Sequence, residues 1–310
     1  MSTQSNAMPE SALGSQVAIP TVISPARRMY WLVRRELWEG RAIYIAPVAV
    51  AALILLGFLI SMIHFAGKMR AALALDPMQQ HEITMRPYHF AELLIMGTTF
   101  IVAVFYCLDA LYGERRDRSI LFWKSLPVSD LATVLSKASI PLVVLPLVTF
   151  AITVVTQGII LLLSTVALIG SGVSVAKLWN DVSLWQMSLM LLYHLVAVHA
   201  LWYAPIYGWL LLVSSWARRM PFLWAVLPPL AIGVVEKIAF NTSHFATMLG
   251  NRFMGGREGV AYTASSMSME PLSQINPGRF LISPGLWIGF AIAAIFLAGA
   301  VRLRRYREPI

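Results

Sequence analysis

The sequence predicts an all-α integral membrane protein with six transmembrane helices. Of its 310 residues, 58% are hydrophobic and only 13% are charged, whereas a soluble domain usually contains about a quarter charged residues. Six apolar segments have about the 20 residues that a helix needs to cross a bilayer. The formal charge of +9 then indicates lysines and arginines on the cytoplasmic face of a membrane, and not a surface that binds nucleic acid.

The first 41 residues precede the first apolar segment. Residues 1–24 are small and polar and contain no apolar core of the kind that a signal peptide has, so we expect a disordered cytoplasmic tail. Residues 25–41 have helical spacing, with apolar side chains on one arc. This pattern predicts an amphipathic helix in the membrane interface, with a cytoplasmic extension of the first span as the alternative. Its predicted lipid contacts are Arg27, Arg28, Trp31, Arg34, Arg35 and Trp38.

The predicted transmembrane domain comprises residues 42–303. Its six spans are residues 43–64, 92–111, 139–169, 184–213, 222–240 and 285–301. The third and fourth spans are longer than a minimal crossing, so they must tilt, bend or project beyond the bilayer. Pro141, Pro146 and Pro205 are candidate bend points, because proline removes a backbone hydrogen bond.

The distribution of basic residues predicts the orientation. With the N-terminus placed inside, 16 of the 24 lysines and arginines lie on the cytoplasmic side, clustered at span ends where the positive-inside rule has most force. Both termini, including the basic tail 304–310, are therefore predicted to be cytoplasmic. The expected location is the inner (cytoplasmic) membrane, as a multi-pass protein. Residues 241–284 form the largest outer loop, where several glycines predict turns or short broken helices.

Few polar groups are expected deep in the membrane. They are His64, Gln157, His194 and His199. The last two are five residues apart, so they do not share one face of an α-helix. No chain of carboxylates crosses the membrane in this prediction, which gives little support to proton-coupled or ion-coupled transport.

No enzyme motif is present. The chain has no phosphate-binding loop, no nucleophile elbow and no zinc-protease helix motif. Its single cysteine, Cys107, lies in an apolar run, which excludes a cysteine-based metal cluster. We therefore expect no cofactor and no catalytic residue on this chain. If ATP drives the protein, another chain must bind the nucleotide.

The loop 113–137 between the second and third spans is the most charged passage. It begins GERRDRSILFWKSLPVS and carries both signs of charge. Ser119 can cap a short helix over 120–126, Pro127 ends it, and a second helix is expected over 131–137. An ordinary positive-inside loop would explain the arginines but not the interleaved acids. The pattern predicts a docking surface for a partner.

This loop resembles the corresponding loop in the membrane subunits of type-2 ABC exporters. The matching residues are Glu114, Arg115, Ser119, Ile120, Pro127, Val128, Ser129, Ser136 and Lys137. The six spans, the cytoplasmic termini, the basic helix before the first span and the long last outer loop are similar as well. The resemblance thus extends over nearly the whole chain.

The resemblance implies a permease subunit that pairs with a second copy and rests on a cytoplasmic ATPase dimer, which binds ATP and Mg. The loop would act as the coupling helix between this chain and the ATPase. The coupling residues would be Glu114, Arg115, Arg116, Asp117, Arg118, Phe122, Trp123 and Lys124, with Arg218 and Arg219 as a second cytoplasmic contact. The transported substrate is not indicated.

Two other functions fit parts of the pattern. A non-transporting membrane anchor or sensor could recruit a cytoplasmic partner through the same loop, although such a protein needs only one or two spans. A self-sufficient channel or secondary transporter would need polar spans, and these spans are apolar. The exporter permease is the function that we expect.

Overall fold

The computed structural model describes residues 24–125, 128–169, 174–253 and 277–306. Every regular element in these ranges is a helix. Six helical stretches are long and apolar enough to cross a membrane: Ala42–Ala72, Pro77–Arg116, Asp130–Leu168, Val175–Trp202, Pro221–Phe240 and Pro284–Tyr306. The predicted all-α membrane fold with six such helices is therefore confirmed.

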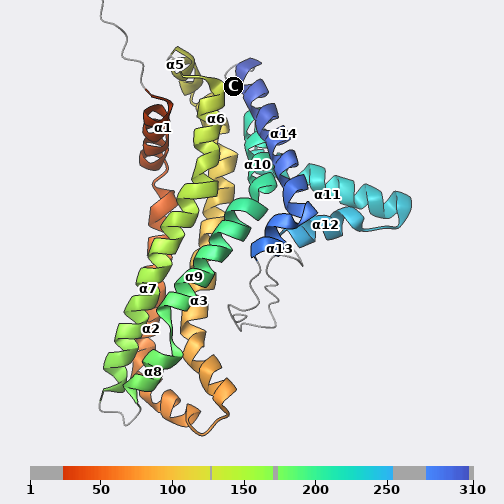
Figure 1. Ribbon diagram of the computed structural model, residues 1–310. Helices are drawn as coiled ribbons and strands as arrows, with labels where there is room; N and C mark the ends of the chain where they lie inside the picture. Colours follow the sequence, from red (N-terminus) through yellow and green to blue (C-terminus); the bar gives the residue numbers. More distant parts are fainter. Residues whose placement is uncertain (1–23, 126–127, 170–173, 254–276, 307–310) are drawn as a thin grey trace, which may run out of the picture.

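Three long helices form the body of the bundle: α2 (Ala42–Ala72), α3 (Pro77–Ala110) and α7 (Leu145–Leu168). They lie side by side along its long axis, and α8 (Val175–Asp181) lies at one end of them (Figure 1). Phe58, Tyr88 and Ile160 contribute to the buried cluster that joins α2, α3 and α7. Because lipid tails are as apolar as these side chains, close packing holds the helices together, and the hydrophobic effect contributes little.

Helix α10 (Ala204–Trp216) packs against the other end of α3, and α14 (Pro284–Tyr306) packs against α10. A Cβ atom at Gly208 would lie 3.3 Å from the backbone of Ala293. The absence of a side chain at Gly208 therefore lets α10 and α14 approach closely, as small residues do between membrane helices.

Two π-helical segments interrupt the long helices. Segment η1 (Ile140–Val144) joins α6 (Asp130–Ser139) to α7, and η2 (Leu195–Trp202) continues α9 (Leu184–His194). In a π-helix, residues five apart come onto one face. The rings of His194 and His199 accordingly lie 5.9 Å apart between centroids. The prediction that they do not share a face was wrong, because it assumed a regular α-helix.

Helix α3 begins at Pro77, well before the predicted start of the second span at residue 92. Pro87 lies inside this helix, where the sequence gives no reason to expect continuity. As a result Glu92, taken as a span boundary, lies in the middle of α3 with 2% of its surface exposed. The predicted set of polar residues at depth was therefore incomplete.

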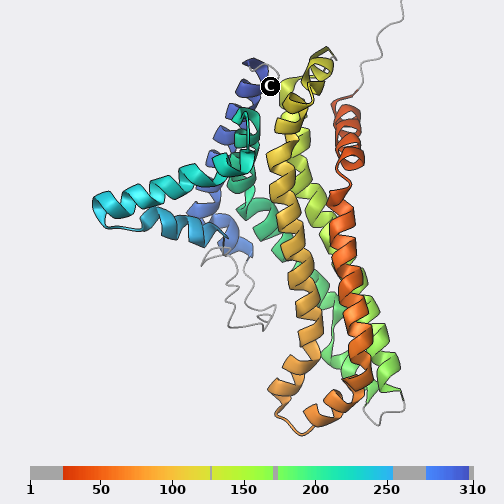
Figure 2. The same cartoon turned by 180° about the vertical axis from the view of Figure 1, so that it is seen from behind.

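The fifth apolar helix, α11 (Pro221–Phe240), leaves the bundle sideways with α12 (His244–Phe253) folded back beside it (Figures 1 and 2). Asn241 adopts the left-handed conformation with φ 51° at the turn. The carboxylate of Glu236 accepts hydrogen bonds from the backbone N–H groups of His244 and Phe245. Of the predicted outer loop 241–284, the described helices are α12 and α13 (Pro277–Ile282), and residues 254–276 lie outside the described ranges.

Helix α1 (Pro25–Glu39), the short helices α4 (Tyr112–Arg116) and α5 (Ser119–Ser125), the start of α6 and the last turn of α14 gather at one end of the bundle (Figure 1). We call this the α4–α5 end. It places both described ends of the chain on the same side. That this side is cytoplasmic stays a prediction, as do the roles of the tails 1–24 and 304–310, which lie largely outside the described ranges.

Candidate coupling site at the α4–α5 end

The turn from α3 into α4 is fixed by a residue of α10. At this turn the backbone N–H groups of Leu111 and Tyr112 both donate to the Oγ of Ser214, at 3.0 and 2.9 Å. Ser214 is fully buried, so water cannot replace it as the acceptor. The direction in which α4 leaves α3 is therefore set by contact with α10.

Arg115 attaches α4 to α10 a second time. Its Nη1 donates to the carbonyl oxygens of Ser215 at 2.8 Å and Ala217 at 3.1 Å. These carbonyls belong to the C-terminal end of α10, where backbone acceptors lack helical partners and the helix dipole favours a cation. The side chain is buried, with 3% of the residue exposed. Arg115 thus acts as a cap for α10.

Glu114, the neighbour of Arg115, lies at the centre of a buried ion network. Its carboxylate is 3.2 Å from the Nζ of Lys137 and 2.9 Å from the Nη2 of Arg304. Lys137 also pairs with Glu36 at 2.9 Å, and Arg304 pairs with Asp130 at 2.7 Å. One network therefore joins α1, α4, α6 and α14, which are far apart in sequence.

The network extends to α3 through a hydroxyl group. The Oη of Tyr106 donates to Glu36 at 2.7 Å. Glu36, Glu114, Lys137 and Arg304 are each less than 9% exposed. Removing one member of such a set leaves an uncompensated charge in a low dielectric, which costs far more than a surface pair contributes. The four helices and α3 are thus held as one unit at this end.

The remaining coupling residues of the sequence prediction lie outside the network. Arg116, Asp117, Arg118 and Phe122 are exposed, and Arg116 pairs with Asp117 at 3.0 Å. The guanidinium of Arg35 lies 3.4 Å from the ring centroid of Trp123, which joins α1 to α5. The side chain of Lys124 lies outside the described set.

The structure therefore divides the predicted coupling residues into two groups. Glu114 and Arg115 face other helices of this chain, whereas the residues from Arg116 to Arg118, together with Leu121 and Phe122, form the surface open to a partner. Arg218 and Arg219, predicted as a second contact, are exposed just after α10 ends. Whether a partner binds there stays a prediction.

The predicted membrane-interface residues lie on α1. Leu32 and Glu36 are its buried positions, and α1 packs on α6. Trp31 and Trp38 are exposed, and the guanidinium of Arg34 lies 5.1 Å from the centroid of each ring. Arg35 pairs with Glu39 at 2.7 Å, Arg27 is exposed and Arg28 is half-buried. The contact of α1 with lipid stays a prediction.

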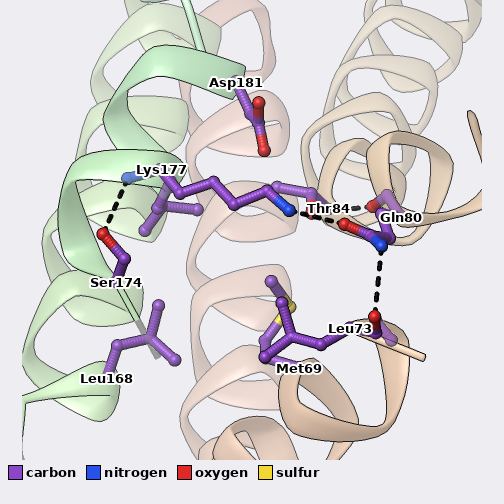
Figure 3. Close-up of a pocket in the computed structure, with 10 residues that line it drawn as sticks. Met69, Leu73, Gln80, Thr84, Leu168, Ser174, Lys177 and Asp181 are labelled. Atoms are coloured by element: carbon purple, nitrogen blue, oxygen red, sulfur yellow. Dashed lines mark hydrogen bonds between the residues drawn. The ribbon is translucent and has the colours of Figure 1, made fainter. Parts of the chain in front are cut away.

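A small pocket lies at the opposite end of the bundle (Figure 3). Lys177 of α8 extends across it and donates to the Oε1 of Gln80 at 2.5 Å. The Nε2 of Gln80 donates in turn to the carbonyl oxygen of Leu75. Within the described residues no cluster of His, Cys, Asp and Glu side chains could hold a metal ion. The polar groups of this pocket pair mainly with one another, so it is a weaker candidate than the α4–α5 end.

Comparison of the chain with protein-family models, with curated proteins and with solved structures finds no significant match. The resemblance to type-2 ABC exporters is thus a prediction from the residues quoted above.

Sequence reasoning did not find the buried roles of Glu36, Asp130 and Arg304. The available signal was a set of acids and bases close to the predicted span ends at one side of the membrane. Lys137 was found only as part of the family motif. Which of these charges meet depends on how the helices pack, and no local spacing indicates it.

Proposed function

We propose that this chain is the permease subunit of an ATP-driven exporter. It would pair with a second copy and be driven by a separate dimeric ATPase that binds ATP and Mg. The observation that carries the proposal is the construction of the α4–α5 end. The exposed, charged segment at this end is joined by buried ion pairs to α1, α6 and α14.

The network supports the proposal because it couples a movement of the α4–α5 segment to the long helices of the bundle. Helix α4 follows α3 directly, Arg115 ties it to α10, and Glu114 ties it to α6 and α14. A displacement of α5 by a partner would therefore move α3, α6, α10 and α14 together, since breaking any buried contact is costly. Rigid-body movement of packed helices is a common way to pass such a displacement to a distant site.

The exposed residues supply a surface that a protein partner could recognise. Arg116, Asp117 and Arg118 present both signs of charge, which fixes the register and choice of a partner more than it raises affinity. Leu121 and Phe122 are 59% and 60% exposed, and such apolar side chains can fill a groove. If this segment served only to set the orientation of the chain in the membrane, it would need only the arginines.

The test is to purify the tagged full-length chain from its native membrane in mild detergent and to identify what accompanies it. We expect a stoichiometric protein that carries a phosphate-binding loop. Reversing the exposed charges with R116E and R118E, or truncating the apolar contact with F122A, should remove that protein. The permease itself should stay folded, because none of the three side chains takes part in the buried network.

The matched control is Arg41→Ala, an exposed arginine between α1 and α2. It should leave the association unchanged. If the chain purifies alone, or with a partner that has no nucleotide-binding motif, the exporter proposal fails and the membrane anchor takes its place.

A further inference from the structure

A seam of polar side chains runs between α3 and α7 inside the bundle. The hydroxyl groups of Thr99 and Thr149 lie 2.8 Å apart, and about three to four turns further from the α4–α5 end Tyr88 lies near Ser164. Because α3 and α7 are antiparallel, the residues between these two pairs face each other in reverse order. Glu92 is therefore level with Gln157, and Met96 with Thr153.

The two ends of the seam differ in how their polar atoms are satisfied. The hydroxyls of Thr99 and Thr149 lie within hydrogen-bond distance of each other and of the carbonyl oxygens of Ile95 and Leu145 on their own helices. Each hydroxyl has one proton, so one of them donates to the other and the second donates to its carbonyl. This is ordinary polar contact between membrane helices.

Further along the seam, polar atoms lack such partners within the described structure. The Oγ1 of Thr153 and both amide atoms of Gln157 are buried without a hydrogen bond. Thr153 and Gln157 are both 0% exposed. Buried polar atoms are nearly always paired in proteins, so an unpaired set calls for an explanation.

The π-helical segment η2 brings a histidine to the same level. The backbone N–H of Tyr203 donates to the carbonyl of Val198 at 3.0 Å, five residues earlier. His199 interacts with the backbone of Met96, one helical turn from Glu92 on α3, and its Nδ1 is buried without a partner. Single π-turns within α-helices occur frequently at functional sites.

The helices around the seam contribute to it one acidic side chain and no lysine or arginine. Residues 88–108 of α3 contain one acidic residue, Glu92, and no lysine or arginine. Residues 140–168 and 184–216, which pack against that stretch, contain no charged residue, and residues 42–63 of α2 contain none either. The other titratable groups of this region are Tyr88 and His89 on α3, His194 at the end of α9 and His199 in η2. A single carboxylate among hydrogen-bond acceptors at membrane depth favours a cation.

We infer that the seam is a binding site for the cationic amine group of an amphipathic cargo. An alkylammonium group has three N–H donors, and the seam offers three acceptors: the carboxylate of Glu92, the Oε1 of Gln157 and the Oγ1 of Thr153. The Nδ1 of His199 is a fourth polar atom at this level. The inference deepens the proposed function, because it names the chemistry of what the permease would carry.

Entry of the cargo requires α3 and α7 to separate, since the seam is closed in this structure. Helix α3 continues into α4, and α7 is joined through η1 to α6, which belongs to the same ion network. The α4–α5 segment is therefore connected to both walls of the seam.

The experiment uses the purified full-length chain in nanodiscs without any ATPase, and hexylammonium as the probe. Thermal unfolding should shift upward with hexylammonium and not with hexanol, which has the same chain without the charge. The shift should disappear in Glu92→Gln and in Gln157→Leu. It should persist in Thr149→Val, which removes a satisfied polar contact of the same seam.

Gln157→Leu keeps the test decisive if Glu92→Gln does not fold. An apolar side chain of similar size in place of an unpaired amide is expected to preserve stability. Equal shifts in all variants, or equal shifts with hexanol, would overturn the amine site. Because no ATPase takes part, such a result leaves the exporter proposal standing, and failure to find an ATPase leaves this site standing.

Discussion

The charged residues at the α4–α5 end mainly form ion pairs and hydrogen bonds within their own chain. Lys137 is 2% exposed and lies within ion-pair distance of both Glu36 and Glu114. A single cation is thus shared by two carboxylates on different helices. Its energetic importance follows from what its removal would leave behind, because two buried carboxylates would then face each other without it.

We predict that Lys137→Met destabilises the protein by about 3–5 kcal/mol, the range for breaking a buried ion pair. The measurement is equilibrium unfolding in mixed micelles, followed by circular dichroism. Arg116→Met is the control, since Arg116 is exposed and pairs only with exposed acids. It should give no measurable change. Equal stability of the two variants would show that the network does not hold the helices together.

A second residue-scale prediction concerns the contact of α12 with the bundle. The guanidinium of Arg252 lies 4.1 Å from the ring centroid of Trp202 and donates to the carbonyl of Gly285 at 3.0 Å. Burial lowers the pKa of Arg252 to about 10. A Cβ at Gly289 would overlap this guanidinium, so Gly289→Ala should expel Arg252 and loosen α12.

Limited proteolysis within α12 measures this effect, and cleavage should be several-fold faster in Gly289→Ala. The matched control is Gly57→Ala on α2, where a Cβ meets nothing within 4 Å. That change should leave cleavage unchanged, because alanine favours a helix over glycine and meets no obstacle. Unchanged cleavage in Gly289→Ala would show that Arg252 does not anchor α12.

At the scale of elements, the turn between α11 and α12 depends on a single carboxylate. Glu236 accepts hydrogen bonds from the Oγ1 of Thr242 and from the backbone N–H groups of His244 and Phe245. It thereby satisfies N–H groups of the first turn of α12 that have no helical acceptor. Glu236 thus does for α12 what a side chain at the N-cap usually does.

Glu236→Ala should therefore fray the start of α12. Hydrogen exchange at the amides of His244 and Phe245 should become faster, while exchange in the bundle stays unchanged. Lys237→Ala changes the neighbouring charge, and no hydrogen bond of the Lys237 side chain is found in the described structure, so it serves as the control. Faster exchange in both variants would assign the effect to α11 as a whole.

The sequence predicts which segments form long helices better than it predicts the directions in which those helices run. Apolar runs of about 20 residues are a strong signal, so all six long helices were expected. The early start of α3 was missed because Glu82, Arg86 and Pro87 resemble a loop. The π-turn of η2 was missed because periodicity alone assumes a regular helix. The sideways course of α11 depends on packing against α10, which no local pattern specifies.

The same limit applies to the candidate site. Charge pattern located the α4–α5 segment, and a capping serine with a following proline indicated α5 but not α4. It did not indicate that Glu114 and Arg115 turn inward while Arg116 and Asp117 turn outward. That division depends on residues about 100 to 190 positions away along the chain. Contacts of such long range are set by the assembled bundle.

At the scale of the whole molecule, the α4–α5 end and the projecting pair of helices are built differently. Ion pairs join α1, α4, α6 and α14 at the α4–α5 end, whereas α11 and α12 project sideways from the bundle (Figure 2). The turn of this projecting pair carries Glu236, Lys237 and His244. Charged groups are costly in hydrocarbon, so the turn must reach water on one side of the membrane.

The sequence orientation predicts that this turn is extracytoplasmic and the α4–α5 end cytoplasmic. Cysteine labelling tests it directly, because the single native cysteine, Cys107, is 0% exposed and gives little background. In intact cells, a membrane-impermeant maleimide should label Ser243→Cys and leave Asp117→Cys unlabelled until the membrane is permeabilised. Both positions are exposed in the structure, so failure to label reports the membrane barrier and not burial. Labelling of both positions only after permeabilisation would mean that α11 does not cross the membrane, and the proposed exporter topology would then fail with it.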